Sequence, residues 1–411
     1  MTATALQQEE HLPEAIVCKW CGKSFHYLKS HISMGRCENI PESAKGLDVD
    51  EVVKMYTSAF PDEPTISRTA LAKLNEKLAE KHSGEGKVAE ISAHPGYVGT
   101  VEYKTELVAA HELLGVTIKE LGTPRGKPLQ VTVNVNTPYP EFVPEAKKNY
   151  VYGDFDLIKD IFMMLEIGIP GYLWGHAGTG KSSLPTQLCA LLNRPLIRAQ
   201  HTASMEEAHV TGQILARDGS TYFEPGLLAL AMKNGWVYLA DEYDFAFPQI
   251  LGVYQPVLEG EPLIIKEATP DWRRITPHKR FAFIGTGNTN GSGDETGLYQ
   301  GTNIQNAANF SRFGIVSNVK YMSTKAEVNM LAEAGVIREY AEKMVKFANL
   351  VREGYEQHLI SQPIGPRELL LSAKIGMMRG DFSAGIEKSF INKLPSTSAQ
   401  AAREVVQKIF G

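Results

Sequence analysis

The chain has 411 residues, of which 43% are hydrophobic and 22% charged, and its formal net charge at pH 7 is -5. This length is too great for one compact core and predicts two or three folding units of ordinary globular composition. The acidic balance excludes a chain that coats nucleic acid along its whole surface. The N-terminus lacks a signal-peptide layout, and no apolar run reaches the roughly 18 residues of a membrane span, so we expect a cytoplasmic protein with no membrane partner.

Residues 1–45 contain three of the four cysteines, in the stretch CKWCGKSFHYLKSHISMGRC. The spacing C-x2-C-x4-H-x4-H-x5-C supplies the sulfur and imidazole ligands that Zn²⁺ prefers. We predict a small C2HC-type zinc finger whose metal ligands are Cys18, Cys21, His31 and Cys37. His26 is a fifth candidate. The alternative is an unfolded segment whose cysteines bind no metal, which is disfavoured because so short a segment rarely folds without a bound metal or a disulfide.

The predicted finger is basic. Four basic residues and no acidic one lie between its first and last cysteines: Lys19, Lys23, Lys29 and Arg36. A basic finger on an acidic chain could contact nucleic acid, and it could equally dock another protein. The stretch resembles the Ros-type fingers that open many phage and bacterial proteins, in which Phe25 and Leu28 would form the small core.

Residues 46–145 are predicted to hold helical and β segments, and the sequence indicates no chemistry for them. A helix is expected from about Arg68 to His82, because Leu71, Leu74 and Leu78 recur at spacings of three and four. The alternating stretch LQVTVNVN predicts a half-buried strand over 129–136.

From about residue 150 short apolar segments alternate with helical ones, which predicts an α/β domain with a parallel sheet. The expected strands are Gly171 to Trp174, Pro195 to Ala199, Trp236 to Ala240, Arg280 to Thr286 and Ile315 to Val319. After Ser323 the pattern is mostly helical to the end of the chain.

The stretch GHAGTGKS follows the first of these strands and matches G-x-x-x-x-G-K-[ST], a phosphate-binding loop. Glycines let backbone N–H groups wrap the phosphates, the lysine reaches the terminal phosphates and the hydroxyl binds Mg²⁺. A chain of this length contains about 0.02 such matches by chance. We therefore predict that ATP is held by Gly175, His176, Ala177, Gly178, Thr179, Gly180, Lys181, Ser182 and Ser183, with Ser182 as a magnesium ligand.

Two acids end the apolar stretch WVYLADEYD, 60 residues beyond Lys181. We expect Asp241 to join the nucleotide site by holding Mg²⁺ through water, and Glu242 to polarise the attacking water. Two acids after an apolar run more often cap a strand, and the phosphate loop is what favours catalysis here. At the end of the strand FAFIGTGNTN, Asn288 could orient the same water or simply form a turn.

Two arginines complete the candidate site. Arg312 in NFSRFG and Arg367 in IGPRELL are candidates for neutralising charge on the γ-phosphate during transfer. A single arginine is usually a surface or packing residue. Their order after a phosphate loop, an acidic strand and a polar strand favours the catalytic interpretation.

The order of these motifs resembles that of the AAA+ ATPases of the MoxR-like branch, and within it the CobS family of cobaltochelatase ATPase subunits. The resemblance covers about Ala146 to Gly411, and its most specific part is NTNGSGDETGLYQGTNIQNAANFSRFGIV. It implies an AAA+ P-loop NTPase core with αβα layers over 146–322 and a helical lid over 323–411. The finger and the α+β region that precede this core fall outside the resemblance.

The resemblance also implies roles for residues. Gly175 to Ser182 would be Walker A, Asp241 and Glu242 Walker B, Asn288 sensor 1 and Arg367 sensor 2. Arg312 would be an arginine finger offered to a neighbouring subunit, which implies a homo-oligomeric ring, in this family usually a hexamer. The stretch VTGQILARDGSTYFEPG would be a hairpin inserted in helix 2.

Two functions fit the sequence. The first is an ATP-hydrolysing MoxR/CobS-like motor subunit that drives a separate von Willebrand A or CobT-like partner, for instance in a cobaltochelatase-like metal-insertion complex, since no D-x-S-x-S motif occurs in this chain. The second is a nucleic-acid motor or restriction-type NTPase recruited by the zinc finger. A non-hydrolysing scaffold is disfavoured by the complete set of Lys181, Asp241 and Glu242.

Overall fold

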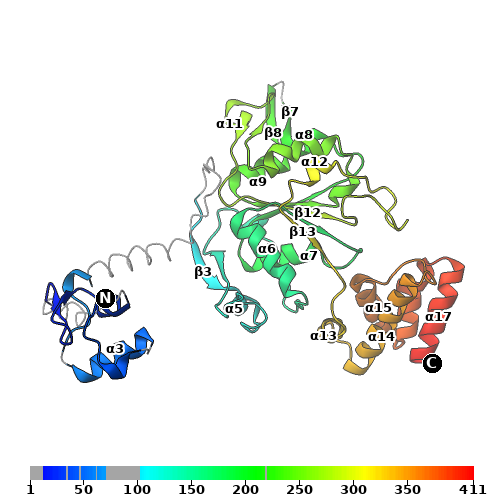
Figure 1. Cartoon of the computed structure of the whole chain (residues 1–411). Coiled ribbons are helices and arrows are strands. Elements are labelled where there is room, and N and C mark those ends of the chain that lie inside the picture. Colours follow the sequence, from blue (N-terminus) through cyan, green and yellow to red (C-terminus); the bar gives the residue numbers. More distant parts are fainter. Residues whose placement is uncertain (1–12, 34–35, 46–47, 62, 71–101, 218–219) are drawn as a thin grey trace. The chain divides into compact units, whose positions relative to one another are not determined.

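The computed structural model describes residues 13–33, 36–45, 48–61, 63–70, 102–217 and 220–411 (Figure 1). The chain divides into two units, Met1–Ser92 and Ala93–Gly411, and each is considered by itself. Beyond Ala70, the helix predicted up to His82 lies outside the described residues. Within the described ranges, no helix is both long and apolar enough to cross a lipid bilayer.

The first unit is built around a short antiparallel hairpin followed by two helices. Its elements are β1 (Ile16–Val17), β2 (Ser24–Phe25), α2 (Leu28–Ser33), a 3₁₀ turn η1 (Glu42–Ala44) and α3 (Val49–Ala59). Phe25 and Leu28 are buried in its core, as predicted, and Val52 and Tyr56 of α3 are buried with them. The Tyr56 hydroxyl accepts a hydrogen bond from the backbone N–H of Lys19 at 3.0 Å. The core of the finger therefore extends beyond residue 45.

A five-stranded parallel sheet forms the centre of the second unit, in the order β13-β5-β12-β9-β6. Its strands are β5 (Gly171–Trp174), β6 (Leu196–Gln200), β9 (Val237–Asp241), β12 (Ala282–Gly287) and β13 (Ile315–Asn318). All five strands predicted from the sequence are confirmed. Because parallel strands end at the same edge, the polar residues that follow them are gathered there.

The central strands β5, β9 and β12 are buried on both faces, which is why they are almost wholly apolar. Tyr238 and Ala240 of β9 lie in one hydrophobic core, with α9 (Leu227–Asn234), and Val237 and Leu239 lie in the other. The second core includes α6 (Phe155–Ile167) and α7 (Ser183–Leu191) (Figure 1). Cys189 is buried in α7, as predicted. The second unit is an α/β domain with a parallel sheet, as the alternation of apolar and helical segments predicted.

A hairpin separates α9 from the short helix α8 (Glu207–Thr211). Its antiparallel strands are β7 (Gly212–Arg217) and β8 (Ser220–Pro225), at the position where the resemblance implied an inserted hairpin. Seven further short elements connect the strands and helices of this unit: η3 (Tyr243–Phe245), η4 (Ile250–Tyr254), α10 (Gln255–Leu258), β10 (Leu263–Ile264), α11 (Pro270–Arg273), β11 (Arg274–Ile275) and α12 (Ala307–Phe310).

A second hairpin, ahead of α6, belongs to the same unit. Its elements are β3 (Thr105–Ala109), α5 (Ala110–Leu114) and β4 (Gln130–Asn134), followed by η2 (Pro140–Phe142). The strand predicted from LQVTVNVN is confirmed as β4. Thr132 donates hydrogen bonds from its backbone N and from Oγ1 to the carboxylate of Glu166 in α6, at 3.1 and 2.6 Å. This part of the 46–145 region therefore shares a core with α6.

The chain after Ser323 is helical, as predicted. The helices are α13 (Thr324–Glu333), α14 (Arg338–Glu356), α15 (Pro366–Arg379), α16 (Phe382–Ser389), η5 (Ile391–Lys393) and α17 (Ser396–Phe410), and they share one hydrophobic core. Arg352 of α14 donates two hydrogen bonds to the buried carboxylate of Glu327 in α13, at 2.8 and 2.7 Å. This paired, bidentate contact fixes the two helices against each other.

Candidate functional site

The loop of residues 175–182 joins β5 to α7 at the carboxyl edge of the sheet. Gly178 and Gly180 adopt φ angles of 81° and 100°, which L side chains rarely tolerate. A Cβ atom on Gly175 would lie 2.4 Å from the carbonyl oxygen of Val319. The backbone path of the loop therefore requires its glycines, and this path is what exposes N–H groups to a phosphate.

Lys181 is held at the centre of the site. Its Nζ donates hydrogen bonds to the carbonyls of Gly175 and His176 at 2.7 and 2.9 Å and to Asn288 Oδ1 at 3.0 Å. Burial lowers the pKa of Lys181 to about 8, while the nearby carboxylates of Asp244, Asp241 and Glu242 act to raise it. Lys181, predicted to bind phosphate, and Asn288, a candidate for orienting the attacking water, are therefore in contact.

Asp241 is almost fully buried and accepts hydrogen bonds on both carboxylate oxygens. Ser182 Oγ and Thr286 Oγ1, the latter at 2.5 Å, donate to Oδ1, and Arg198 Nε donates to Oδ2 at 2.6 Å. Burial acts to raise the pKa of Asp241, and these hydrogen bonds outweigh it and hold the pKa below its usual value.

The donor set around Ser182 and Asp241 fits Mg²⁺. Because Ser182 gives its proton to the carboxylate, its oxygen lone pairs remain available to a cation. A hydroxyl and a carboxylate are the hard oxygen ligands that Mg²⁺ takes, together with waters and substrate phosphates. The predicted magnesium residues are thus brought together.

Glu242 follows β9 in a left-handed backbone conformation, with φ 54° and ψ 42°. Such a conformation costs a non-glycine residue roughly 1–2 kcal/mol and is concentrated at functional sites. The exposed side chain accepts a hydrogen bond from Gln200 Nε2 at 2.5 Å. Gln200, at the end of β6, was not among the residues predicted from the sequence.

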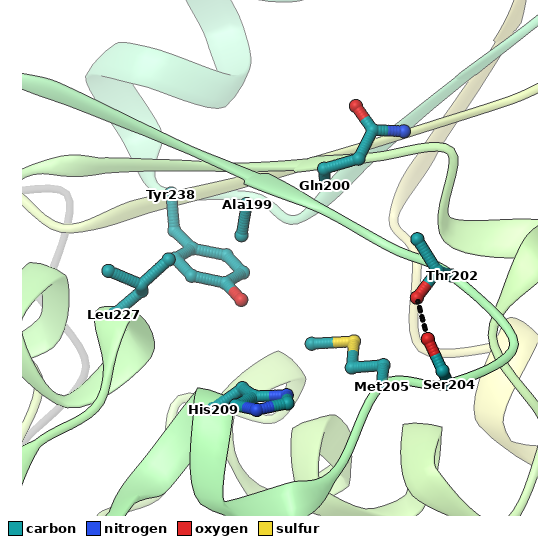
Figure 2. Close-up of a pocket in the computed structure, with 8 residues that line it drawn as sticks. All are labelled: Ala199, Gln200, Thr202, Ser204, Met205, His209, Leu227 and Tyr238. Atoms are coloured by element: carbon teal, nitrogen blue, oxygen red, sulfur yellow. Dashed lines mark hydrogen bonds between the residues drawn. The ribbon is translucent and has the colours of Figure 1, made fainter.

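Gln200 also lines a cavity of about 170 Å³. The lining residues are Ala199, Gln200, Thr202, Ser204, Met205, His209, Leu227 and Tyr238. Figure 2 shows the amide of Gln200 turned away from the other side chains that line the cavity. The stem of Gln200 therefore borders the cavity, while its amide holds the carboxylate of Glu242.

Replacing Gln200 by alanine should raise ATP turnover, because it removes the hydrogen bond that engages the candidate catalytic base. We expect an increase on the order of fivefold, about the equilibrium effect of 1 kcal/mol from one hydrogen bond. Steady-state ATPase assays at saturating ATP measure this. Gln407→Ala, at an exposed glutamine of α17, is the matched control. Unchanged or reduced turnover in Gln200→Ala would mean that the contact does not restrain Glu242.

Asn288 is fixed by a buried acid that the sequence reasoning missed. Asp244 Oδ2 accepts hydrogen bonds from the backbone N–H groups of Asn288 and Thr289, at 2.8 and 2.9 Å, and from Thr289 Oγ1 at 3.0 Å. Burial raises the pKa of Asp244, against these hydrogen bonds. Asp244 therefore orders the turn that presents the Asn288 amide to Lys181.

The two candidate arginines lie in different places. Arg367 is at the start of α15, where its backbone would be 3.6 Å from a Cβ atom placed on Gly178, and its charge lowers the pKa of Lys181. Arg312 instead donates from Nε to Glu259 at 2.7 Å and from its guanidinium to the carbonyl of Ala308. The structure brings Arg367 to the phosphate loop and leaves Arg312 on a separate surface.

The predicted zinc ligands converge in the first unit. The ligand atoms of Cys18, Cys21, His31 and Cys37 all lie within 4.8 Å of one another. The two sulfurs of Cys18 and Cys37 are 3.8 Å apart, and Cys21 Sγ is 3.3 Å from His31 Nε2. Tetrahedral bonds of about 2.3 Å from Zn²⁺ to sulfur place two sulfurs about 3.8 Å apart, so the cluster fits this metal.

His26, the fifth candidate ligand, is not part of the cluster. Its Nδ1 lies 3.0 Å from Ser67 Oγ, and its carbonyl accepts a hydrogen bond from the backbone N–H of Ser67 at 2.8 Å. His26 thus ties the finger to the residues that follow α3.

The folded finger is less basic than its central sequence. Lys19 pairs with Glu63 at 2.7 Å, and Lys23 pairs with Glu38 at 2.5 Å. Over residues 13–70 the sequence has eight acidic and seven basic side chains. Acids from outside the cysteine cluster therefore offset part of the positive charge that suggested nucleic-acid binding.

One family model and several known proteins match this chain. The family model described as AAA domain (dynein-related subfamily) matches residues 172–302. The aerobic cobaltochelatase subunit CobS of Sinorhizobium sp is 32% identical over 249 residues, which cover 58% of this chain and 74% of that protein. An uncharacterized protein of Staphylococcus aureus strain NCTC 8325 is 23% identical over 265 residues, 62% of this chain and 96% of that one. Among solved structures, the RuvB Holliday junction branch migration motor of Thermotoga maritima aligns over 65% of this chain and 72% of its own, with 13% identity and a TM-score of 0.38.

Proposed function

This chain belongs to the AAA+ ATPase family that contains the aerobic cobaltochelatase subunit CobS, and from that membership we propose that it is the ring-forming motor subunit of a complex with a separate partner. The observation that carries the proposal is the meeting of Lys181, Asn288 and the Ser182 and Asp241 pair at one edge of the sheet. These groups form a phosphate and metal site together with the glycine loop.

ATP hydrolysis needs positioning and charge neutralisation more than covalent chemistry. The loop N–H groups and Lys181 bind the phosphates, and Ser182 and Asp241 would hold Mg²⁺, which supplies positive charge to the phosphate oxygens. Glu242 accepts the proton of the attacking water, and Asn288 orients that water. Arg367, beside the phosphate loop, neutralises charge on the transferred group.

We assign the work of the ring to a second protein. CobS is by name a subunit of an aerobic cobaltochelatase, and this chain covers 74% of it. A von Willebrand A or CobT-like subunit that receives the conformational change is the partner we propose, in a cobaltochelatase-like metal-insertion complex. The location proposed for this complex is the cytoplasm.

The zinc finger is proposed to recruit this partner rather than nucleic acid. Lys19 and Lys23 of the finger are paired with acids, and residues 13–70 have no excess of basic residues. Nucleic-acid binding depends on unpaired cations that neutralise phosphates. A protein-docking role makes no such demand on the charge of the finger.

The recruitment proposal is tested by comparing two stimulants of the purified ATPase. The partner recovered at a constant ratio from the native cell should change the ATPase rate, and removal of residues 1–70, which include the whole core of the finger, should weaken that effect. DNA and RNA serve as the alternative stimulants. Strong, salt-sensitive stimulation by nucleic acid that disappears on the same truncation would instead establish a nucleic-acid motor.

Replacing Cys18 by serine should remove zinc from the finger and leave the ATPase active, because the two functions reside in separate units. Metal binding supplies much of the folding free energy of so small a module, so its helical signal should fall as well. Elemental analysis of the purified protein measures one zinc per chain in the wild type and loss of zinc in the variant. His26→Ala is the matched control and should keep its zinc. Zinc retained by Cys18→Ser would disprove the ligand set.

A further inference from the structure

Tyr299 touches the phosphate loop from a segment distant in sequence. Its hydroxyl oxygen accepts a hydrogen bond from the backbone N–H of Ala177 at 3.1 Å and lies 2.9 Å from Nδ1 of His176. Tyr299 belongs to the stretch between Asn288 and Arg312, which supplied the most specific sequence motif, and Tyr299 itself has no role in the site described above.

The contact restrains a single peptide unit from both sides. The carbonyl of His176 accepts a hydrogen bond from Lys181 Nζ at 2.9 Å, and the N–H of the same peptide, on Ala177, donates to Tyr299. Lysine at this position of the loop also reaches phosphate, so its bond to the carbonyl competes with phosphate. The N–H of Ala177 donates to Tyr299 and not to phosphate, so this bond can hold the peptide while Lys181 and the other loop N–H groups bind phosphate.

The protonation states of the two rings support the arrangement. Burial raises the pKa of Tyr299, so its hydroxyl keeps its proton, and burial together with Lys181 lowers the pKa of His176, so its imidazole is neutral at pH 7. A hydroxyl that accepts from Ala177 has its own proton to donate to His176 Nδ1. The Ala177 N–H and the His176 Nδ1 atom therefore both have a hydrogen-bond partner in the Tyr299 hydroxyl.

The segment that carries Tyr299 is itself well anchored. Asp294 accepts a hydrogen bond from the backbone N–H of Tyr299 at 2.6 Å and another from that of Thr296 at 2.9 Å. Asn303 donates from its backbone to the carbonyl of Asp244 at 2.7 Å. The hydroxyl is therefore presented from a fixed turn rather than from a loose loop.

The imidazole on the other side is held by aromatic contacts. His176 stacks on Tyr321, with an interplanar angle of 2° and a centroid distance of 5.8 Å, and meets Tyr355 edge to face. The guanidinium of Arg352 lies 4.0 Å from the centre of the Tyr321 ring. Rings from two other segments, at Tyr321 and Tyr355, thus contact His176, which in turn contacts Tyr299.

We propose that Tyr299 is a positioning residue for the nucleotide, whose hydroxyl holds the peptide between His176 and Ala177 in the orientation that the phosphate-binding loop needs. The inference rests on the proposed ATP site and adds to it a residue from the stretch between Asn288 and Arg312. It also makes this segment respond directly to the phosphate loop.

The test is Tyr299→Phe, which keeps the ring and removes only the hydroxyl. The KM for ATP, and the dissociation constant for ADP measured by calorimetry, should each rise by about threefold to tenfold, as expected for loss of one hydrogen bond that orders the site. The kcat at saturating ATP should stay within about twofold of the wild type, since the groups around the attacking water are untouched. Tyr340→Phe, in α14 and stacked on Phe382, is the matched control and should match the wild type.

Thermal melting separates positioning from mere stability. The melting temperature of Tyr299→Phe without nucleotide should fall by no more than roughly 4 °C, while the rise caused by ADP should be smaller than in the wild type. The inference is overturned if Tyr299→Phe binds nucleotide as tightly as the wild type. It is also overturned if a lower melting temperature without nucleotide accounts for the whole loss of nucleotide affinity. If the wild type itself binds no nucleotide, the proposed site fails instead, so the two failures are distinct.

Discussion

Replacing Glu242 by glutamine should leave ATP binding intact and lower ATP turnover by at least about a hundredfold, because general base catalysis contributes this much or more. Glutamine preserves the size of the side chain and its contact with Gln200 while removing the carboxylate that takes a proton from water. Nucleotide binding by calorimetry and steady-state phosphate release measure the two halves of the expectation.

Two control variants give this result its meaning. Lys181→Ala should lose nucleotide binding altogether, because it removes the cation that reaches the phosphates from the centre of the site. Glu404→Gln, at an exposed glutamate of α17, should behave as the wild type. Near-normal hydrolysis by Glu242→Gln would show that another group is the catalytic base.

The fold was largely predictable because its strongest signals are local. The central strands of the sheet are short apolar runs buried on both faces, and β9 shows this in the residues Val237 to Ala240. The phosphate loop is a contiguous motif, and so is the cluster of three cysteines and His31, whose members lie within twenty residues of one another. Where the geometry follows from one stretch of chain, sequence spacing is a sufficient guide.

The residues that were missed act across strands, and that is why spacing could not reveal them. Arg198 and Gln200 are two residues apart near the end of β6. Arg198 contacts Asp241, the last residue of β9, and Gln200 contacts Glu242, which follows it. Thr286 reaches Asp241 in the same way from β12. A signal existed, since polar residues at the carboxyl ends of neighbouring parallel strands must meet. Choosing among them required the order of the strands, which the sequence pattern does not provide.

The charge of the folded finger was also not predictable from the residues between its cysteines alone. The finger was expected to be basic from the residues between its cysteines, yet the acids that pair with Lys19 and Lys23 lie outside that stretch, at Glu63 and Glu38. Local charge counts miss such partners because folding brings them from elsewhere in the chain. The proposal for the finger changes accordingly, from an even choice to a preference for protein docking.

Replacing Arg312 by alanine should lower ATP turnover on the order of a thousandfold without loss of nucleotide binding, if it is an arginine finger that acts on the neighbouring subunit. In the described part of the chain Arg312 contacts neither Lys181 nor Asp241 and pairs with Glu259 instead. Its side chain is 25% exposed and that of Glu259 is 50% exposed. An ion pair so close to solvent contributes only about 0–1 kcal/mol to stability, so Arg312 can leave Glu259 at little cost in free energy.

Mixing two inactive variants tests whether Arg312 acts on the ATP site of a neighbouring subunit. Arg312→Ala subunits keep Lys181, and Lys181→Ala subunits keep Arg312, so a ring that contains both has some interfaces with each group intact. With equal amounts and random assembly, about one quarter of the head-to-tail interfaces should be complete, which sets the recovered activity. Arg338→Ala, at an exposed arginine paired with Glu342, is the matched control and should be active alone. If well-formed mixed rings stay inactive, Arg312 does not complete a neighbour's site, and its pairing with Glu259 is then only a surface contact.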